Sequence, residues 1–169
     1  MSLYVVIDPS GRLAYELVYD PTQHPKERER ERRNYYYLGD RPVGMRDYAV
    51  GELGSPTHDW IVTDHLATPW KVLSSTASTR WSGTYYPFGL LRTESGSTRR
   101  GNLRFPGQYH DRESGLYYNV YRTYQPHDGR YISVDPILDA SLSPYSYVDD
   151  CPVMYNDPLG LQYAVLRDL

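Results

Sequence analysis

Four Asp-Pro dipeptides are the first candidates for chemistry in this sequence, and they begin at Asp8, Asp20, Asp135 and Asp157. Two carboxylates held about 3 Å apart cannot both ionise, so one keeps a proton and the pair can supply an acid and a base for amide hydrolysis. Asp-Pro also begins turns, because the aspartate hydrogen-bonds nearby backbone and the proline fixes φ. The dipeptides alone therefore favour turns, and most of them need no catalytic task.

Other side chains that bind metals or act as nucleophiles are scattered along the chain. Cys151 is the single cysteine, so no internal disulfide can form, and the five histidines lie apart at positions 24, 58, 65, 110 and 127. No Cys/His spacing matches a structural zinc site. We therefore expect no metal and no cofactor.

The densest charge cluster is the segment KERERERR at residues 26–33. It could form a patch for phosphate or a protein partner, but its three acids among five bases favour a solvated segment of alternating sign. The whole chain has 18 basic and 21 acidic residues, and its net charge of −3 predicts no general affinity for nucleic acid. No stretch approaches the roughly 18 apolar residues of a membrane span, and the N-terminus lacks the pattern of an ordinary secretion signal.

Period-two alternation and frequent turns predict strands in the N-terminal half. Leu13, Tyr15, Leu17 and Tyr19 share one face of the first predicted strand. Gly39 and Asp40 predict a hairpin, and residues 58–75 predict two more strands joined at DHLATP. Nineteen tyrosines against two phenylalanines suit strand surfaces that are half in contact with water.

The C-terminal half continues this pattern. Residues 92–102 carry no apolar side chain larger than the threonine methyl groups and are expected to form an exposed loop. One strand is expected from Leu116 to Tyr124, between turns at DRESG and PHDG. Turns recur every 8 to 15 residues, which leaves no room for crossover helices. We predict an all-β antiparallel meander with little helix, limited to a short turn near residues 139–148.

Several segments together resemble the RHS/YD-repeat proteins, specifically their C-terminal repeat-associated core domain. IDPSGRLAYELVYD resembles one degenerate YD repeat. YYYLGDRPVGM and TDHLATPWKV resemble the stretch before the core, with Ala67 where the family usually has glycine. The core segments then follow in the family's order: YYPFG, LRFPGQYHDRESGLYYNVYRTYQPHDGRYISVDPI and YSYVDDCPVMYNDPLGL. The match covers nearly the whole chain apart from the charged segment and the last eight residues.

The resemblance implies a ribbon-like β-sheet shell that encloses a C-terminal toxin, with the core closing one end. Such proteins occur as polymorphic bacterial toxins, as type VI secretion effectors and as the C component of insecticidal toxin complexes. The expected partners are the rest of an RHS shell, a toxin domain or another secretion-system protein. The expected location is the bacterial cytoplasm before export, with secretion by a specialised system that needs no signal peptide.

The same resemblance divides the chain into four parts. Residues 1–91 form a degenerate YD-repeat-like segment with the charged insert at 26–33, and residues 92–102 form the loop. Residues 103–161 form the core, which ends in DPLGL. Residues 162–169 form a short tail where a toxin domain would normally begin, and eight residues are too few to be one.

In self-cleaving relatives two aspartates act in the manner of an aspartic protease, once, on the bond that follows the DPxGL motif. The matching residues here are Asp135 and Asp157, which lie 22 positions apart. The bond expected to be cut joins Leu161 to Gln162. The resemblance therefore implies autoproteolysis that releases the toxin.

Three further residues have expected supporting roles. Pro158 stiffens the approach to the bond, and Gly160 supplies the backbone freedom that the strand needs to bend. Arg130 lies five residues before Asp135 and could orient a carboxylate, although a place on the sheet surface is the alternative. The chain departs from the family at Ser143 and at 149–150, where relatives commonly have asparagines.

Two other interpretations stay open. The chain could be a non-catalytic structural cap, or an orphan or truncated RHS fragment, that acts by binding a partner; its C-terminus would then stay intact. A carbohydrate-binding β module is a third possibility because tyrosine-rich faces can stack on sugars, but no spacing selects it.

Overall fold

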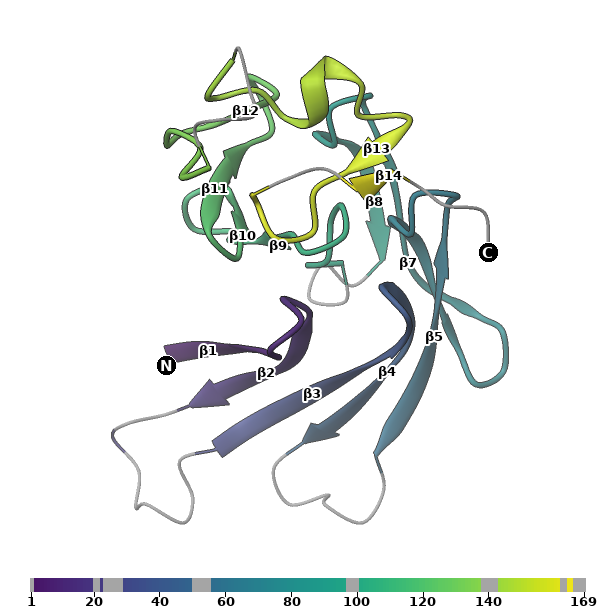
Figure 1. Ribbon diagram of the computed structural model, residues 1–169. Coiled ribbons are helices and arrows are strands. Elements are labelled where there is room, and N and C mark those ends of the chain that lie inside the picture. Colours follow the sequence, from purple (N-terminus) through teal and green to yellow (C-terminus); the bar gives the residue numbers. More distant parts are fainter. Residues whose placement is uncertain are drawn as a thin grey trace.

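The computed structural model describes residues 2–19, 22, 29–49, 56–96, 101–137, 143–161 and 164–165. Within these residues the chain consists of antiparallel strands and connecting turns, with one short 3-10 turn at Val148–Asp150 (Figure 1). The prediction of an all-β fold with little helix is therefore confirmed. No helix in the described part of the chain has the length and apolar character needed to cross a membrane.

The larger sheet is a meander in which each strand pairs with its neighbours in the sequence. The hairpin predicted around Gly39 is confirmed by the pairing of Leu38 with Arg41, and the two strands predicted on either side of DHLATP are present. The eight strands, in spatial order, are β1 (Ser2–Ile7), β2 (Leu13–Tyr19), β3 (Glu29–Leu38), β4 (Arg41–Ala49), β5 (Thr57–Thr63), β6 (Pro69–Ser74), β7 (Thr79–Tyr85) and β8 (Leu91–Gly96).

The C-terminal part contains two smaller sheets. One has four short strands in the order β12-β11-β10-β9, and the other pairs two strands on either side of the DPLGL segment. Their bounds are β9 (Tyr109–His110), β10 (Tyr117–Asn119), β11 (Arg122–Gln125), β12 (Arg130–Tyr131), β13 (Tyr155–Asn156) and β14 (Ala164–Val165).

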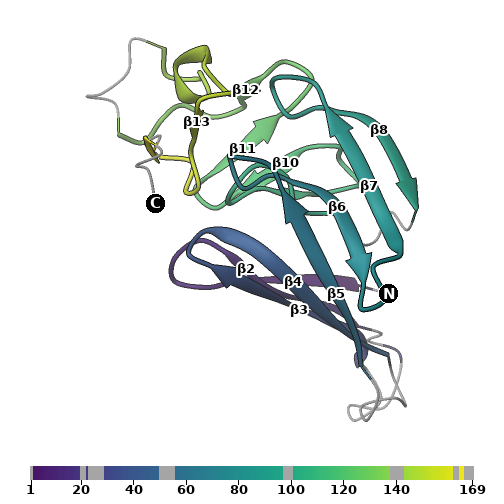
Figure 2. The same cartoon turned by 90° about the vertical axis from the view of Figure 1, so that its right-hand side faces the viewer.

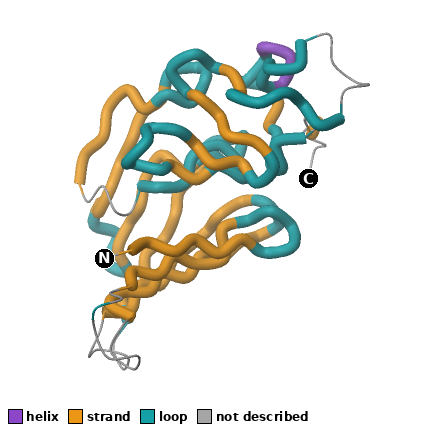
Figure 3. Tube along the Cα trace, turned by 90° about the vertical axis from the view of Figure 1, so that its left-hand side faces the viewer, coloured by secondary structure: helices purple, strands orange, loops and turns teal. Residues whose placement is uncertain are grey.

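The long sheet curves around the C-terminal part, which lies against one of its faces. Figure 1 shows β9 to β13 on the same side of the sheet, with β9 and β10 nearest to the turn that joins β1 to β2, and Figure 2 shows the C-terminal part above that sheet from another side. Figure 3 shows the contrast between the two parts, because the sheet is nearly all strand whereas loops make up most of the C-terminal part. Residues far apart in the sequence therefore meet where the first hairpin faces the C-terminal segments.

Among the described residues the core consists of two apolar clusters, and the first of them joins the two parts. The first lies between the long sheet and the start of the C-terminal part, and Trp81 is completely buried in it. The second is an aromatic cluster inside the C-terminal part, where the rings of Tyr124 and Tyr147 lie 4.9 Å apart. The hydroxyl of Tyr124 donates to the carbonyl of Phe88 at 2.7 Å. The first cluster comprises Leu13, Tyr35, Met45, Ile61, Val72, Trp81, Leu103 and Tyr109, and the second Phe105, Tyr117, Tyr124, Tyr131, Tyr147 and Val148.

The charged segment differs from the solvated stretch that its composition suggests. Residues 26–28 lie outside the described part, but β3 already begins at Glu29. Strand alternation turns Arg33 to the inner face, where it is buried between Glu16 of β2 at 3.3 Å and Asp47 of β4 at 2.6 Å. Burial raises the pKa of Glu16, and the charge of Arg33 opposes that rise. Arg33, the last residue of the segment, is therefore part of the sheet interior, whereas Arg32 is exposed.

The predicted loop at 92–102 is a strand over its first half. Leu91–Gly96 forms β8 at the edge of the sheet and pairs with β7. Its side chains are mostly exposed, and the hydroxyls of Thr84 and Thr93 contact each other across the pair at 2.6 Å. An edge strand needs few apolar residues, which explains why the composition resembled a loop. Residues 97–100 lie outside the described part, and Gly101 and Asn102 are buried.

The predicted strand from Leu116 to Tyr124 is a tight hairpin. β10 and β11 pair through Asn119 and Arg122, so Val120 and Tyr121 form the turn. Val120 has a φ of +52°, a conformation that is rare for a β-branched residue. Neither Val120 nor Tyr121 is a residue type that predicts a turn. The buried residues of this hairpin are Tyr117, Asn119, Arg122 and Tyr124, which one continuous strand from Leu116 to Tyr124 would not place on the same face.

Candidate functional site

The two predicted aspartates lie in loops that meet beside the second sheet. Asp135 follows β12, and Asp157 follows β13. Asp135 is 8 % exposed and Asp157 is 2 % exposed. The loop of Asp135 is fixed by its amide, which donates to the carbonyl of Pro144 at 2.9 Å. A buried carboxylate needs compensating donors, so its surroundings decide what the pair can do.

Arg122 lies between the two aspartates and forms an ion pair with each. Its Nη1 lies 3.0 Å from Oδ2 of Asp135, and its Nη2 lies 3.0 Å from Oδ2 of Asp157. A guanidinium offers this fork of donors with a fixed charge, which offsets the repulsion between the two carboxylates. The structure therefore brings the predicted pair together, but through an arginine and not by direct contact of two carboxylates.

Arg122 is held from two more sides. Its Nε donates to the carbonyl oxygen of Gly160, and its guanidinium lies 3.6 Å from the centroid of the Tyr131 ring. Its side chain is only 4 % exposed. The arginine thus contacts both aspartates and the backbone of the DPLGL segment at once.

Sequence reasoning missed Arg122 and named Arg130 in its place. Arg130 precedes Tyr131 in β12, and since Tyr131 points into the aromatic cluster, Arg130 points to solvent. Among the described residues no contact joins Arg130 to either aspartate. Arg122 lies two residues before Tyr124 and therefore on the same face of β11, which indicates that its side chain is buried. This inference requires knowing that the chain turns at 120–121.

Two neutral side chains complete the surroundings of Asp157. The Tyr131 hydroxyl donates to Oδ2 of Asp157 at 2.9 Å. Nδ2 of Asn119 donates to the backbone carbonyl of Asp157 at 3.0 Å and to the hydroxyl oxygen of Tyr131 at 2.7 Å. Burial, and then the charge of Asp157, raise the pKa of Tyr131. Tyr131 therefore stays protonated and acts as a donor.

Asp157 also contacts the residue before the expected cut. Its Oδ1 accepts a hydrogen bond from the amide of Leu161 at 3.0 Å. The carbonyl carbon of Leu161 follows that nitrogen by two covalent bonds, so one carboxylate is anchored next to the bond in question. Gln162, the other half of the bond, lies outside the described residues.

The expected supporting residues of the motif both make close backbone contacts. Pro158 is half-buried beside Gly107, and Gly160 has a φ of +71°, which glycine adopts without strain. The amide of Tyr121 donates to the carbonyl of Leu159 at 3.1 Å. The motif is therefore bound along its length.

The Asp-Pro dipeptides also form turns, as their composition predicts. Asp8 accepts hydrogen bonds from the amides of Ser10 and Arg12, and Asp135 accepts one from the amide of Ile137. Asp20 lies outside the described residues. Asp135 and Asp157 differ from Asp8 in being buried and in sharing an arginine.

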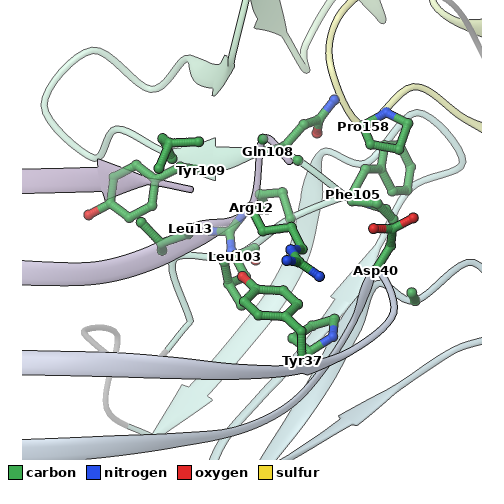
Figure 4. A pocket seen from close by; sticks show the side chains of 16 residues that line it. Arg12, Leu13, Tyr37, Asp40, Leu103, Phe105, Gln108, Tyr109 and Pro158 are labelled. Atoms are coloured by element: carbon green, nitrogen blue, oxygen red, sulfur yellow. Dashed lines mark hydrogen bonds between the residues drawn. The ribbon is translucent and has the colours of Figure 1, made fainter. Parts of the chain in front are cut away.

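A small pocket lies where the first hairpin meets the core, next to the motif. Figure 4 shows Pro158 on its rim, facing Arg12 and Tyr37 from the sheet and Phe105 and Gln108 from the core. The DPLGL segment is thus placed at the junction between the long sheet and the C-terminal part.

Comparison with known sequences finds relatives among bacterial toxins, although no protein-family model matches the chain. The chain is 41 % identical over 113 residues to the toxin protein Tse5 of Pseudomonas aeruginosa, covering 66 % of this chain and 8 % of that protein. It is 38 % identical over 104 residues to the double-stranded DNA deaminase toxin A of Burkholderia cenocepacia, covering 59 % and 7 %. It is 32 % identical over 142 residues to the probable deoxyribonuclease RhsB of Dickeya dadantii, covering 82 % and 10 %.

Comparison with solved structures finds the same fold in toxin-complex proteins. The structure described as TcdB2-TccC3-TEV superposes with a TM-score of 0.72 at 20 % identity, over 94 % of this chain and 9 % of that one. The structure described as TcdB2-TccC3 without hypervariable C-terminal region gives a TM-score of 0.60 at 19 % identity, over 94 % and 9 %. At this identity the likeness concerns the fold.

The matched relatives are much longer than this chain, which spans a tenth or less of the length of each of the three named above. Their names differ in the activity they state, yet they share this one region. The sequence matches and the shared fold agree with the motifs that end in DPLGL. The chain belongs to the RHS-associated polymorphic toxin family.

Proposed function

We propose that this chain is the C-terminal core that closes an RHS shell around a toxin and cuts itself once, after Leu161. The observation that carries the cleavage is the cluster of Asp135, Arg122 and Asp157, in which Asp157 also binds the amide of Leu161. In this proposal residues 103–161 are the core, and the chain from Gln162 onward is the start of the released part.

The proposed reaction is hydrolysis of the Leu161–Gln162 amide. One carboxylate takes a proton from water, and the water oxygen bonds to the carbonyl carbon of Leu161. The same carboxyl group then donates that proton to the leaving nitrogen as the carbon–nitrogen bond breaks, while the other carboxylate keeps its ion pair with Arg122. The products are a carboxylate on Leu161 and an amine on Gln162.

Arg122 has two roles in this proposal. It holds both carboxylates in one place, and its bond to the carbonyl of Gly160 fixes the backbone one residue before the cut. Tyr131 and Asn119 fix Asp157 from the other side. Preorganised groups of this kind lower the cost of reaching the transition state.

Shell closure is supported by what the relatives share. Proteins named as a toxin, a DNA deaminase toxin and a probable deoxyribonuclease match this region, so the region is common to proteins of different stated activity. One structural neighbour is described as lacking a hypervariable C-terminal region, which fits a constant core followed by variable cargo. In the described part of the chain β1 lies at the edge of the long sheet, where a preceding shell strand can pair with it. The protein would act in bacteria that export it by a specialised route, such as type VI secretion.

The test is the intact mass of freshly purified protein beside the Asp135→Asn and Asp157→Asn variants. Self-cleavage predicts that the wild type alone loses residues 162–169. An uncut mass in all three proteins contradicts the proposal. A cut in all three would assign the cleavage to another protease.

A structural cap without chemistry is the second candidate. It is favoured by one observation, namely that Asp135 and Asp157 both make the local backbone hydrogen bonds typical of turn-forming aspartates. It predicts an intact C-terminus and association with a partner, measured as a larger mass in light scattering after mixing with the rest of a shell.

A further inference from the structure

Two glycines from other parts of the chain pack against the DPLGL segment, and one of them lies in the turn between β1 and β2. A Cβ atom on Gly107 would overlap the carbonyl of Pro158, and one on Gly11 would overlap Cδ2 of Leu159. A Cβ atom on Gly160 would lie 2.5 Å from the carbonyl oxygen of Asn119. Real Cβ atoms do not approach other atoms this closely. Pro158 and Leu159 are therefore packed against glycines where only hydrogen fits, and Gly160 is itself such a position.

Gly11 lies in the turn between β1 and β2, and this turn is rigid. Gly11 has a φ of +83°, and the carboxylate of Asp8 accepts hydrogen bonds from the amides of Ser10 at 2.8 Å and Arg12 at 3.0 Å. The Arg12 guanidinium pairs with Asp8 at 2.8 Å and donates to the carbonyl of Gly39 at 3.0 Å. The turn is thus tied both to itself and to the neighbouring hairpin.

Leu159 lies between this turn and the turn of the β10–β11 hairpin. On one side is Gly11, and on the other the amide of Tyr121 donates to the carbonyl of Leu159 at 3.1 Å. The two turns also meet each other, since Cγ2 of Val120 lies 3.2 Å from the Cβ position of Gly11. Figure 4 shows Arg12 and Pro158 on the same pocket at this junction.

We propose that the β1–β2 turn is part of the cleavage site and acts as a positioning element for Leu159, two residues before the cut. This inference rests on the cleavage proposed above. The turn holds Leu159 in place, and through it the bonds of Asp157 to Leu161 and of Arg122 to Gly160. Cleavage then requires that the β1–β2 hairpin is folded and docked against the core. The Pro-Leu-Gly sequence is required because each of its residues fits closely against its neighbours.

The experiment compares Gly11→Ala with Gly39→Ala in the full chain, made by cell-free synthesis and followed by intact mass over time. Both glycines have positive φ in neighbouring hairpins, but no atom lies within 4 Å of the Cβ position of Gly39. Gly39→Ala therefore carries similar backbone strain without the overlap. We expect Gly11→Ala to cleave about 10- to 100-fold more slowly, the usual effect of a small misplacement, and Gly39→Ala to stay within about twofold of wild type.

A rescue variant separates positioning from general damage. Leu159→Ala removes the side-chain atom that a Cβ on Gly11 would meet. The Gly11→Ala, Leu159→Ala double variant is expected to cleave within about threefold of Leu159→Ala alone, because the overlap is gone. Equal cleavage rates for Gly11→Ala and Gly39→Ala would overturn the proposal.

Amide hydrogen exchange decides the question even if the wild type does not cleave. The amide of Tyr121 reports on Leu159, and the amide of Leu161 reports on Asp157. We expect both to exchange about tenfold faster in Gly11→Ala than in Gly39→Ala. That result in an uncleaved wild type would refute self-cleavage and retain the positioning role, whereas unchanged exchange would refute the positioning role.

Discussion

Replacing Arg122 with methionine tests whether the arginine compensates the two buried carboxylates. Methionine keeps much of the apolar stem but removes the cation between Asp135 and Asp157, whose side chains are 11 % and 2 % exposed. Removing one partner of a buried ion pair costs about 3–5 kcal/mol, because the remaining charge is left without compensation. Loss of the contact with the Tyr131 ring adds about 0.5–2 kcal/mol. We expect a loss of at least 3 kcal/mol in the free energy of unfolding.

The assay is urea unfolding followed by tryptophan fluorescence and circular dichroism, with Arg130→Met as the matched control. Arg130 is exposed in the neighbouring strand, so its replacement is expected to change stability by less than about 0.5 kcal/mol. The double variant Arg122→Met, Asp157→Asn removes one of the two carboxylates as well. It should be about 1–3 kcal/mol more stable than the sum of the single effects predicts.

Two results would refute this reasoning. One is a cost for Arg122→Met below about 1 kcal/mol, which would mean that solvent or another group already compensates the aspartates. The other is strict additivity in the double variant, which would mean that Arg122 and Asp157 do not interact in solution.

Two further predictions concern other parts of the fold. Burial and the nearby arginines 104 and 112 lower the pKa of His110 to about 4, below its unfolded value near 6.5, so the protein should lose stability as pH falls from about 6.5 to 4. Since His110 is partly exposed, we expect this loss in the free energy of unfolding to be about 1 kcal/mol. The melting temperature measured against pH should show it. The profile should be flatter in His110→Asn, which keeps an acceptor for Arg104. Ala67 has a φ of +68°, so Ala67→Gly should relieve about 1–2 kcal/mol of strain against an entropic cost of about 0.5–1 kcal/mol. A melting temperature that rises by about 1–3 °C would agree with this balance, and a fall would contradict it.

Local signals in the sequence identified the hairpins whose turns carry glycine or proline. The β3–β4 hairpin at Gly39 was predictable because glycine adopts φ of +59° without strain. The β10–β11 hairpin was not, because its turn contains Val120 and Tyr121. That turn is supported from outside, by the bond between the amide of Tyr121 and the carbonyl of Leu159, 38 residues further on. A contact between residues so far apart in the sequence cannot be recognised from the residues of the turn alone.

The same limit explains the outcome for the candidate site. Asp135 and Asp157 were found through the resemblance, since an Asp-Pro pair alone indicates a turn. Arg122 could not be found in this way, because a buried arginine is unusual and its burial follows from the unforeseen hairpin. One departure from the family does have a physical meaning. Asp149 and Asp150 have φ of +52° and +59°, a conformation in which asparagine and aspartate are enriched, so the asparagines of relatives suit the same turn.

The elements of the site come from almost the full length of the chain, and this bears on when a cut could occur. Gly11 is in the first hairpin, Arg122 in the second sheet, and Asp157 beside the bond itself. None of these groups can be in place before the long sheet has formed and the C-terminal part has docked against it. Since contacts between distant residues form late in folding, a site built from them stays incomplete until the fold is complete. Self-cleavage by this arrangement would therefore follow closure of the core, and cargo would be freed only after it is enclosed.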